Sequence, residues 1–129
     1  MLIDKKIASK GIEIWIDEKG FLYLSIMEDV ELDLETATKT FRIYTELGVG
    51  PENKVLQIIY AQPGSNISPE ARKYVAGKGK LFFKASAIIG TALPIRLVVN
   101  FFNSFYKHEV PFKMFENESA AKKWLEGYR

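Results

Sequence analysis

The stretch Val55-Leu56-Gln57-Ile58-Ile59-Tyr60, followed by a loop at 62–66 and then by Ser68-Pro69, decides the fold of this chain. Its first six residues are almost continuously apolar, which predicts a central strand covered on both faces. Ser68 and Pro69 then suit the N-cap and the first position of a helix. A buried strand that leads into a helix is the building unit of an α/β protein.

The residues before this unit predict a β-hairpin and a helix. Residues 11–16 and 21–26 are rich in β-branched and aromatic side chains, and the turn sequence Asp17-Glu18-Lys19-Gly20 joins them. This pattern predicts two antiparallel strands. A helix is expected over Leu34–Leu47, with Asp33 as its N-cap.

After Pro69 the chain alternates between helices and strands. We expect a helix over Glu70–Ala76 that ends at Gly77 or Gly79, a buried strand over Ala85–Ile89, a helix over Leu93–Tyr106, a short strand over Pro111–Phe115, and a helix that Asn117 caps and that runs through Tyr128. The order is therefore β-β-α-β-α-β-α-β-α. It predicts one α/β domain over residues 1–129, with helices packed on a mixed sheet.

Composition narrows the range of functions. The 129 residues include no cysteine and one histidine, His108, and the formal net charge is +2. The lack of cysteine excludes thiol nucleophiles and thiolate zinc sites, and a single histidine excludes multi-histidine metal sites. The small net charge gives no support for nucleic-acid binding. Since Gly-x-Ser-x-Gly and Walker patterns are also missing, we expect a non-enzymatic protein without a metal or a cofactor.

The apolar segments do not match a secretion signal or a membrane span. No apolar run of 7–15 residues follows the N-terminus, as a signal peptide would require. The long, nearly uncharged segment 85–106 is interrupted by Gly90 and Pro94, so it fits a strand followed by a helix better than a spanning helix. We expect a cytoplasmic protein.

Five segments carry a family resemblance: Ser68–Tyr74, Ala85–Ile89, Asn100–Phe102, Lys113–Phe115 and Ala120–Leu125. They resemble the SpoIIAA-like proteins, a STAS-type family named for the bacterial anti-sigma-factor antagonists, and the resemblance covers nearly the whole chain. It implies a STAS-like fold. Relatives with this fold include partner-switching regulators and CRAL-TRIO-like lipid carriers.

The resemblance also allows one functional feature to be compared. In the antagonists, an Asp-Ser-Ser-Gly-like stretch begins the helix after the central strand, and one of its serines is phosphorylated. Residues 68–71 align with that stretch, so the acceptor position falls on Pro69 or Glu70, neither of which has a hydroxyl group. We therefore expect that Ser68 is a structural N-cap and that the serine phospho-switch is absent.

A basic segment follows this turn. Residues 72–84 contain five bases and no acid: Arg72, Lys73, Lys78, Lys80 and Lys84. Such a segment suits the anionic headgroups of a membrane surface or an acidic protein partner. The alternative is a solvated helix end, where the positive charges interact favourably with the helix dipole.

The predicted helix at 93–106 has more apolar surface than packing on a sheet requires. Its apolar residues are Leu93, Ile95, Leu97, Val98, Val99, Phe101, Phe102, Phe105 and Tyr106. On a helical wheel, Leu93, Val98 and Phe101 lie on one side of the apolar arc, and Ile95, Val99 and Tyr106 lie on the other. The surplus can be covered by a neighbouring helix, a second subunit, an apolar ligand or a membrane.

These features lead to two hypotheses of function. The first is a regulatory or interaction module, homodimeric, that resembles the anti-sigma-factor antagonists in fold but lacks their serine phosphorylation. The alternative is a carrier of an apolar or lipid-like ligand, or a peripheral membrane protein. In that case the helix at 93–106 would be the gate, and the five bases would contact the headgroup.

Overall fold

The computed structural model describes residues 4–90, 92–107 and 109–129, so His108 lies outside the described residues. The elements are β1 (Ile7–Ser9), β2 (Ile12–Ile16), β3 (Phe21–Ile26), β4 (Glu31–Leu32), α1 (Leu34–Glu46), β5 (Val55–Ala61), β6 (Asn66–Ile67), α2 (Pro69–Phe82), β7 (Phe83–Ile89), α3 (Leu93–Tyr106), β8 (Phe112–Phe115) and α4 (Glu118–Glu126). The expected order of the longer elements is confirmed, and three short strands are added to it.

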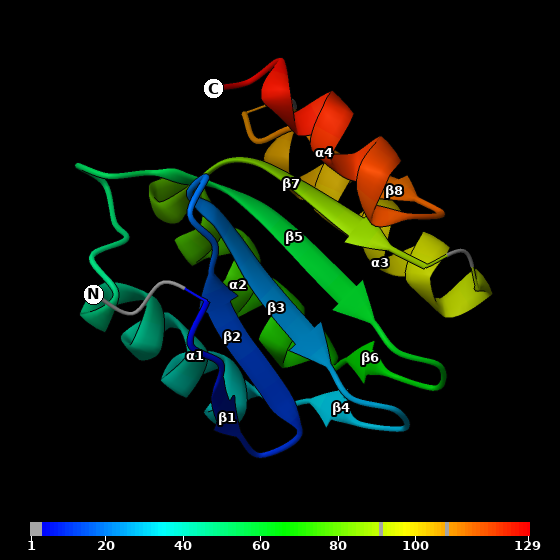
Figure 1. Ribbon diagram of the computed structural model, residues 1–129. Helices are drawn as coiled ribbons and strands as arrows, with labels where there is room; N and C mark the ends of the chain where they lie inside the picture. Colours follow the sequence, from blue (N-terminus) through cyan, green and yellow to red (C-terminus); the bar gives the residue numbers. More distant parts are fainter. Residues whose placement is uncertain (1–3, 91, 108) are drawn as a thin grey trace.

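The main sheet has the strand order β1-β2-β3-β5-β7-β8 (Figure 1). The strands from β1 to β3 pair in the antiparallel sense, whereas β3, β5, β7 and β8 are parallel to one another. This arrangement confirms the predicted hairpin and the predicted mixed sheet. The short strands β4 and β6 form a separate parallel pair beside it.

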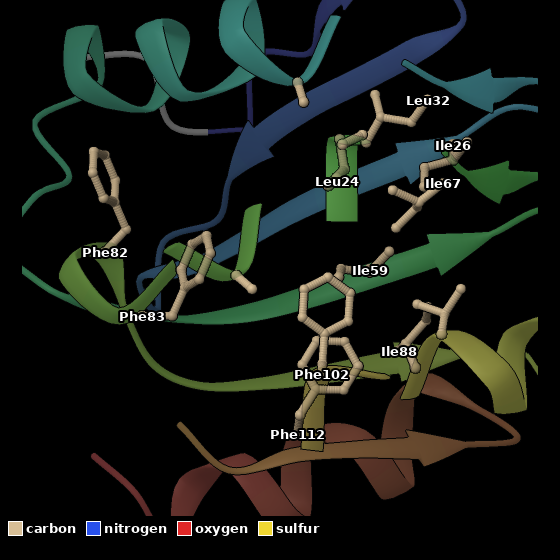
Figure 2. Packing of buried hydrophobic residues seen from close by; sticks show 14 of the residues in the cluster. Leu24, Ile26, Leu32, Ile59, Ile67, Phe82, Phe83, Ile88, Phe102 and Phe112 are labelled. Carbon is tan, nitrogen blue, oxygen red and sulfur yellow. The ribbon is translucent and has the colours of Figure 1, made fainter. Parts of the chain in front are cut away.

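Helices cover both faces of the sheet, and each face has its own apolar cluster. The larger cluster lies under α1, α2 and α3, and Figure 2 shows Phe102 and Phe112 within it beside Ile59 and Ile88. The rings of Phe102 and Phe112 stack with their centroids 4.8 Å apart. On the opposite face, Ile58 of β5 packs in a smaller cluster with residues of α4. Strand β5 therefore buries side chains on both faces, as its apolar sequence predicts.

Three helices begin at the residues that the sequence indicates. The side chains of Asp33, Ser68 and Asn117 each accept a hydrogen bond from the backbone amide three residues later. Each bond satisfies one of the free N–H groups of a first helical turn. These caps fix where the chain turns from the sheet into α1, α2 and α4.

The expected end of α2 at Gly77 or Gly79 is wrong, because the helix continues to Phe82. Gly79 lies against the buried side chain of Tyr106 in α3, and a methyl group on Gly79 would overlap the Tyr106 hydroxyl. A glycine usually weakens a helix, but here the close contact between two helices explains why one is present. The strand β7 therefore begins at Phe83, directly after α2.

Candidate functional site

Helix α3 divides its apolar residues between the core and the surface. Ile95, Val98, Val99, Phe102 and Tyr106 are buried, while Leu93, Leu97 and Phe105 are 68%, 55% and 40% exposed. Phe101 is half-buried. The expected grouping of Val98 with Leu93 and Phe101 is therefore wrong for Val98, because its side chain faces the sheet with Ile95 and Val99. A helical wheel gives angles within a helix but not the direction of the sheet.

The three exposed apolar residues and the half-buried Phe101 follow one line along the helix. Leu93, Leu97, Phe101 and Phe105 are each separated by four positions, so they lie on neighbouring turns of the same face. We call these four residues the α3 stripe. The rings of Phe101 and Phe105 stack with centroids 6.3 Å apart. A line of apolar residues that is largely exposed is typical of an interaction surface.

The C-terminal end of α2 supports the last turn of α3. Lys80 Nζ lies 5.0 Å from the centroid of the Phe105 ring and 3.5 Å from a carboxylate oxygen of Glu109. Burial raises the pKa of the Tyr106 phenol well above its ordinary value. The contacts of Lys80 and Tyr106 hold one end of the α3 stripe in a defined orientation.

The five predicted basic residues have different surroundings in the structure. Arg72 donates from Nε to the Ile67 carbonyl oxygen at 2.8 Å and from Nη2 to Asn66 Oδ1 at 3.1 Å, so it fastens the start of α2. Lys73, Lys78 and Lys84 are exposed. Of these, Lys84 is in β7 and lines a separate hollow together with Lys54 and Arg129.

Ser68 occupies the turn that aligns with the family's phosphorylation site. Its Oγ accepts a hydrogen bond of 3.2 Å from the Ala71 amide, and its side chain is buried. The backbone amide of Ser68 donates to the Leu32 carbonyl, which joins this turn to β4. The predicted N-cap role of Ser68 is confirmed, and the hydroxyl group is engaged in the fold.

A pocket that the sequence did not predict lies at the carboxyl ends of β5 and β7. It has a volume of about 400 Å³ and is lined by residues 61–66, Gly90, Ala92, Pro94 and Ile95. Its walls are the loop after β5 and the first turn of α3. The sequence feature that could have indicated this pocket is the turn at Gly64, directly after the central strand. Ligands of open α/β sheets bind at the carboxyl ends of the strands, where this turn lies.

The described residues contain no helix that is both long and apolar enough to cross a membrane. Within the same part of the chain, no three histidine, aspartate or glutamate side chains gather closely enough to hold a metal ion.

The mixed sheet, with three helices on one face and one on the other, defines a SpoIIAA-like α/β domain. A solved structure supports this class: an uncharacterised protein of the DUF3478 family from Shewanella loihica PV-4, described as having a SpoIIAA-like fold. It shares 23% sequence identity with this chain and superposes with a TM-score of 0.65, and the match covers 92% of this chain and 98% of the other. The expected SpoIIAA-like fold is therefore confirmed.

A family model that matches most of the chain identifies its family. The chain belongs to the family described as "Domain of unknown function (DUF7793)", whose model matches residues 14–129. Comparison with curated proteins gives no match.

Proposed function

We propose that this protein is a non-enzymatic, cytoplasmic interaction module with a regulatory role, and that it forms a homodimer through the α3 stripe. The observation that carries the proposal is the line of apolar side chains on the outer side of α3, in which Leu93, Leu97 and Phe105 are exposed and Phe101 is half-buried. Covering this surface would release water from apolar groups, which is the main driving force of association.

The spacing of the α3 stripe favours a two-fold symmetric partner. If two α3 helices met in an antiparallel arrangement, Leu97 of each would face Phe101 of the other, and Leu93 would approach Phe105. Each contact would then place an aliphatic side chain against an aromatic one. A two-fold interface requires this kind of self-complementary surface, and two-fold dimers are the commonest homo-oligomers.

Two observations favour an interaction module without a phospho-switch over a lipid carrier. The Ser68 hydroxyl is occupied by the Ala71 amide, which is consistent with a module that lacks the serine phospho-switch. The cavity among core residues of α1, α2 and α3 has a volume of only about 20 Å³, whereas sites for drug-sized ligands measure about 300–1,000 Å³. This cavity gives no support to the lipid-carrier alternative.

Light scattering coupled to size-exclusion chromatography tests the proposal. The wild-type protein should elute with twice the chain mass, and Leu97→Glu should be a folded monomer, because it places a charge in the centre of the α3 stripe. Ser119→Glu is the matched control, since Ser119 is exposed on α4, and it should remain dimeric. A wild-type protein that stays monomeric as its concentration rises would contradict the proposed homodimer.

A further inference from the structure

A groove between α1 and α2 is lined by residues of both helices and has a volume of about 190 Å³. We call it the α1–α2 groove. Helix α2 packs against α1 on one side and against α3 on the other (Figure 1). The body of α2 therefore separates this groove from the α3 stripe, and the two surfaces can be tested independently.

Aromatic side chains form the apolar part of the α1–α2 groove. Phe41 and Phe82 line it and are almost fully buried, and their rings meet edge to face with centroids 5.0 Å apart. Figure 2 shows the Phe82 ring directed from the end of α2 towards α1. The half-buried Tyr74 packs edge-on against Phe41 at 5.8 Å. Thr38 and Thr45 complete this part of the lining, and their hydroxyl groups donate to backbone carbonyl oxygens four residues earlier. An apolar side chain therefore suits the groove better than a polar one.

Positive charges flank this aromatic surface on both sides. Arg42 of α1 and Lys78 of α2 are exposed and belong to the lining. Lys78 Nζ lies 6.0 Å from the centroid of the Tyr74 ring, so its ammonium group is beside the aromatic surface. The lining includes no acid, and among the described residues neither Arg42 nor Lys78 forms a salt bridge. Both charges are therefore available to a partner of opposite charge.

We propose that the α1–α2 groove binds an acidic segment of a protein partner. The segment inserts one apolar side chain against Phe41, Tyr74 and Phe82, and its carboxylates lie beside Arg42 and Lys78. An apolar anchor surrounded by complementary charges is the usual arrangement of a protein interface. This inference goes beyond the proposed homodimer, because it gives the interaction module a second surface and states the chemistry of its partner.

The shape of the groove favours a peptide over a membrane surface. Its volume suits a single leucine or phenylalanine side chain. Binding at a membrane interface requires apolar residues that project outwards into the lipid, whereas Phe41 and Phe82 are only 4% and 8% exposed.

Amide chemical shifts measured during titration of the full chain with a synthetic peptide test this site. The probe is the capped peptide Gly-Glu-Asp-Phe-Glu-Asp-Gly, and we expect saturable shifts confined to residues 38–45 and 74–82. Replacing its phenylalanine by alanine should weaken binding about tenfold, because the buried ring is lost. The capped peptide Gly-Lys-Lys-Phe-Lys-Lys-Gly should not bind, because its charges repel those of the groove.

Charge reversal on the protein provides the second test. Arg42→Glu combined with Lys78→Glu should weaken binding of the acidic peptide at least tenfold, and both residues are exposed, so the fold should persist. Lys113→Glu combined with Lys123→Glu is the matched control, because it changes the net charge equally at exposed positions of β8 and α4. This control should bind like the wild type. Leu97→Glu should also bind like the wild type, which separates the result from that of the proposed dimer.

Three results would overturn the proposal: no saturable shift with the acidic peptide, equal binding by the phenylalanine and alanine peptides, or equal binding by the wild type and the Arg42→Glu, Lys78→Glu variant. Sedimentation with vesicles that contain phosphatidylserine tests the membrane alternative. Vesicle binding that this variant loses, without any binding of the peptide, would assign the groove to a membrane surface instead.

Discussion

The contact between Gly79 of α2 and Tyr106 of α3 sets the position of the helix that carries the α3 stripe, and Gly79→Ala tests it. This substitution makes two opposite contributions to the free energy of unfolding. Alanine stabilises a helix interior by about 1 kcal/mol relative to glycine. Its methyl group would, however, overlap the Tyr106 hydroxyl and lie 3.3 Å from the ring carbon Cζ. Adding a methyl group to a filled core typically costs about 1–3 kcal/mol, so the net change should be a loss of up to about 2 kcal/mol.

Gly77→Ala is the matched control within the same helix. A methyl group at Gly77 meets no atom within 4 Å, so only the gain of about 1 kcal/mol in helix stability applies. The gain in helix stability is the same in both variants and cancels. Their free energies of unfolding should therefore differ by the packing cost alone, about 1–3 kcal/mol. At roughly 4 °C per kcal/mol for a domain of this size, the midpoints of thermal unfolding should differ by about 4–12 °C.

Circular dichroism during thermal unfolding measures this difference. We expect Gly77→Ala to raise the midpoint and Gly79→Ala to lower it. Adding Tyr106→Phe to Gly79→Ala should recover part of the loss, because it removes the hydroxyl that the new methyl group would overlap. Equal stabilisation by the two single variants would refute the close packing of α2 on α3.

Three further predictions concern the fold around the candidate sites. Ser68→Ala should lower the free energy of unfolding by about 0.5–2 kcal/mol, measured by urea denaturation, because α2 loses its cap. Ser86 Oγ donates to Gln57 Oε1 at 3.0 Å in the core, so Ser86→Ala should cost about 1–3 kcal/mol in the same assay. Burial, with a contribution from Asp17, raises the pKa of Tyr23 to about 12. The unfolded chain therefore loses this proton first, stability should fall between about pH 10 and 12, and Tyr23→Phe should reduce that fall.

The sequence predicted the elements that have strong local signals. The hairpin at 12–26 combines β-branched strands with a turn, and Asp33, Ser68 and Asn117 mark helix starts that the structure confirms. Strands β4 and β6 have two residues each, and they exist only because residues 31–32 pair with residues 66–67. A pairing between distant short segments leaves no periodic pattern in either of them.

The candidate sites were predicted less completely, for a related reason. The apolar surplus of α3 was visible in the sequence, but the position of Val98 depends on where the sheet lies. Arg72 was grouped with the lysines as a surface charge, whereas the structure engages it with Asn66 and Ile67. The pocket beside Ser65 is formed by the loop after β5 and the first turn of α3, which are distant in the chain, so no local pattern indicates it.

Disulfide trapping between two single-cysteine variants tests the proposed α3 interface most directly. The chain contains no cysteine, so Leu97→Cys and Phe101→Cys each introduce one thiol. A disulfide requires Cα atoms within about 7 Å, and an antiparallel α3 pair would bring position 97 of one copy close to position 101 of the other. We expect an oxidised equimolar mixture to give mainly the 97–101 cross-linked dimer, identified by mass spectrometry. A mixture that stays monomeric, or that forms 97–97, 101–101 and 97–101 links without preference, would contradict it.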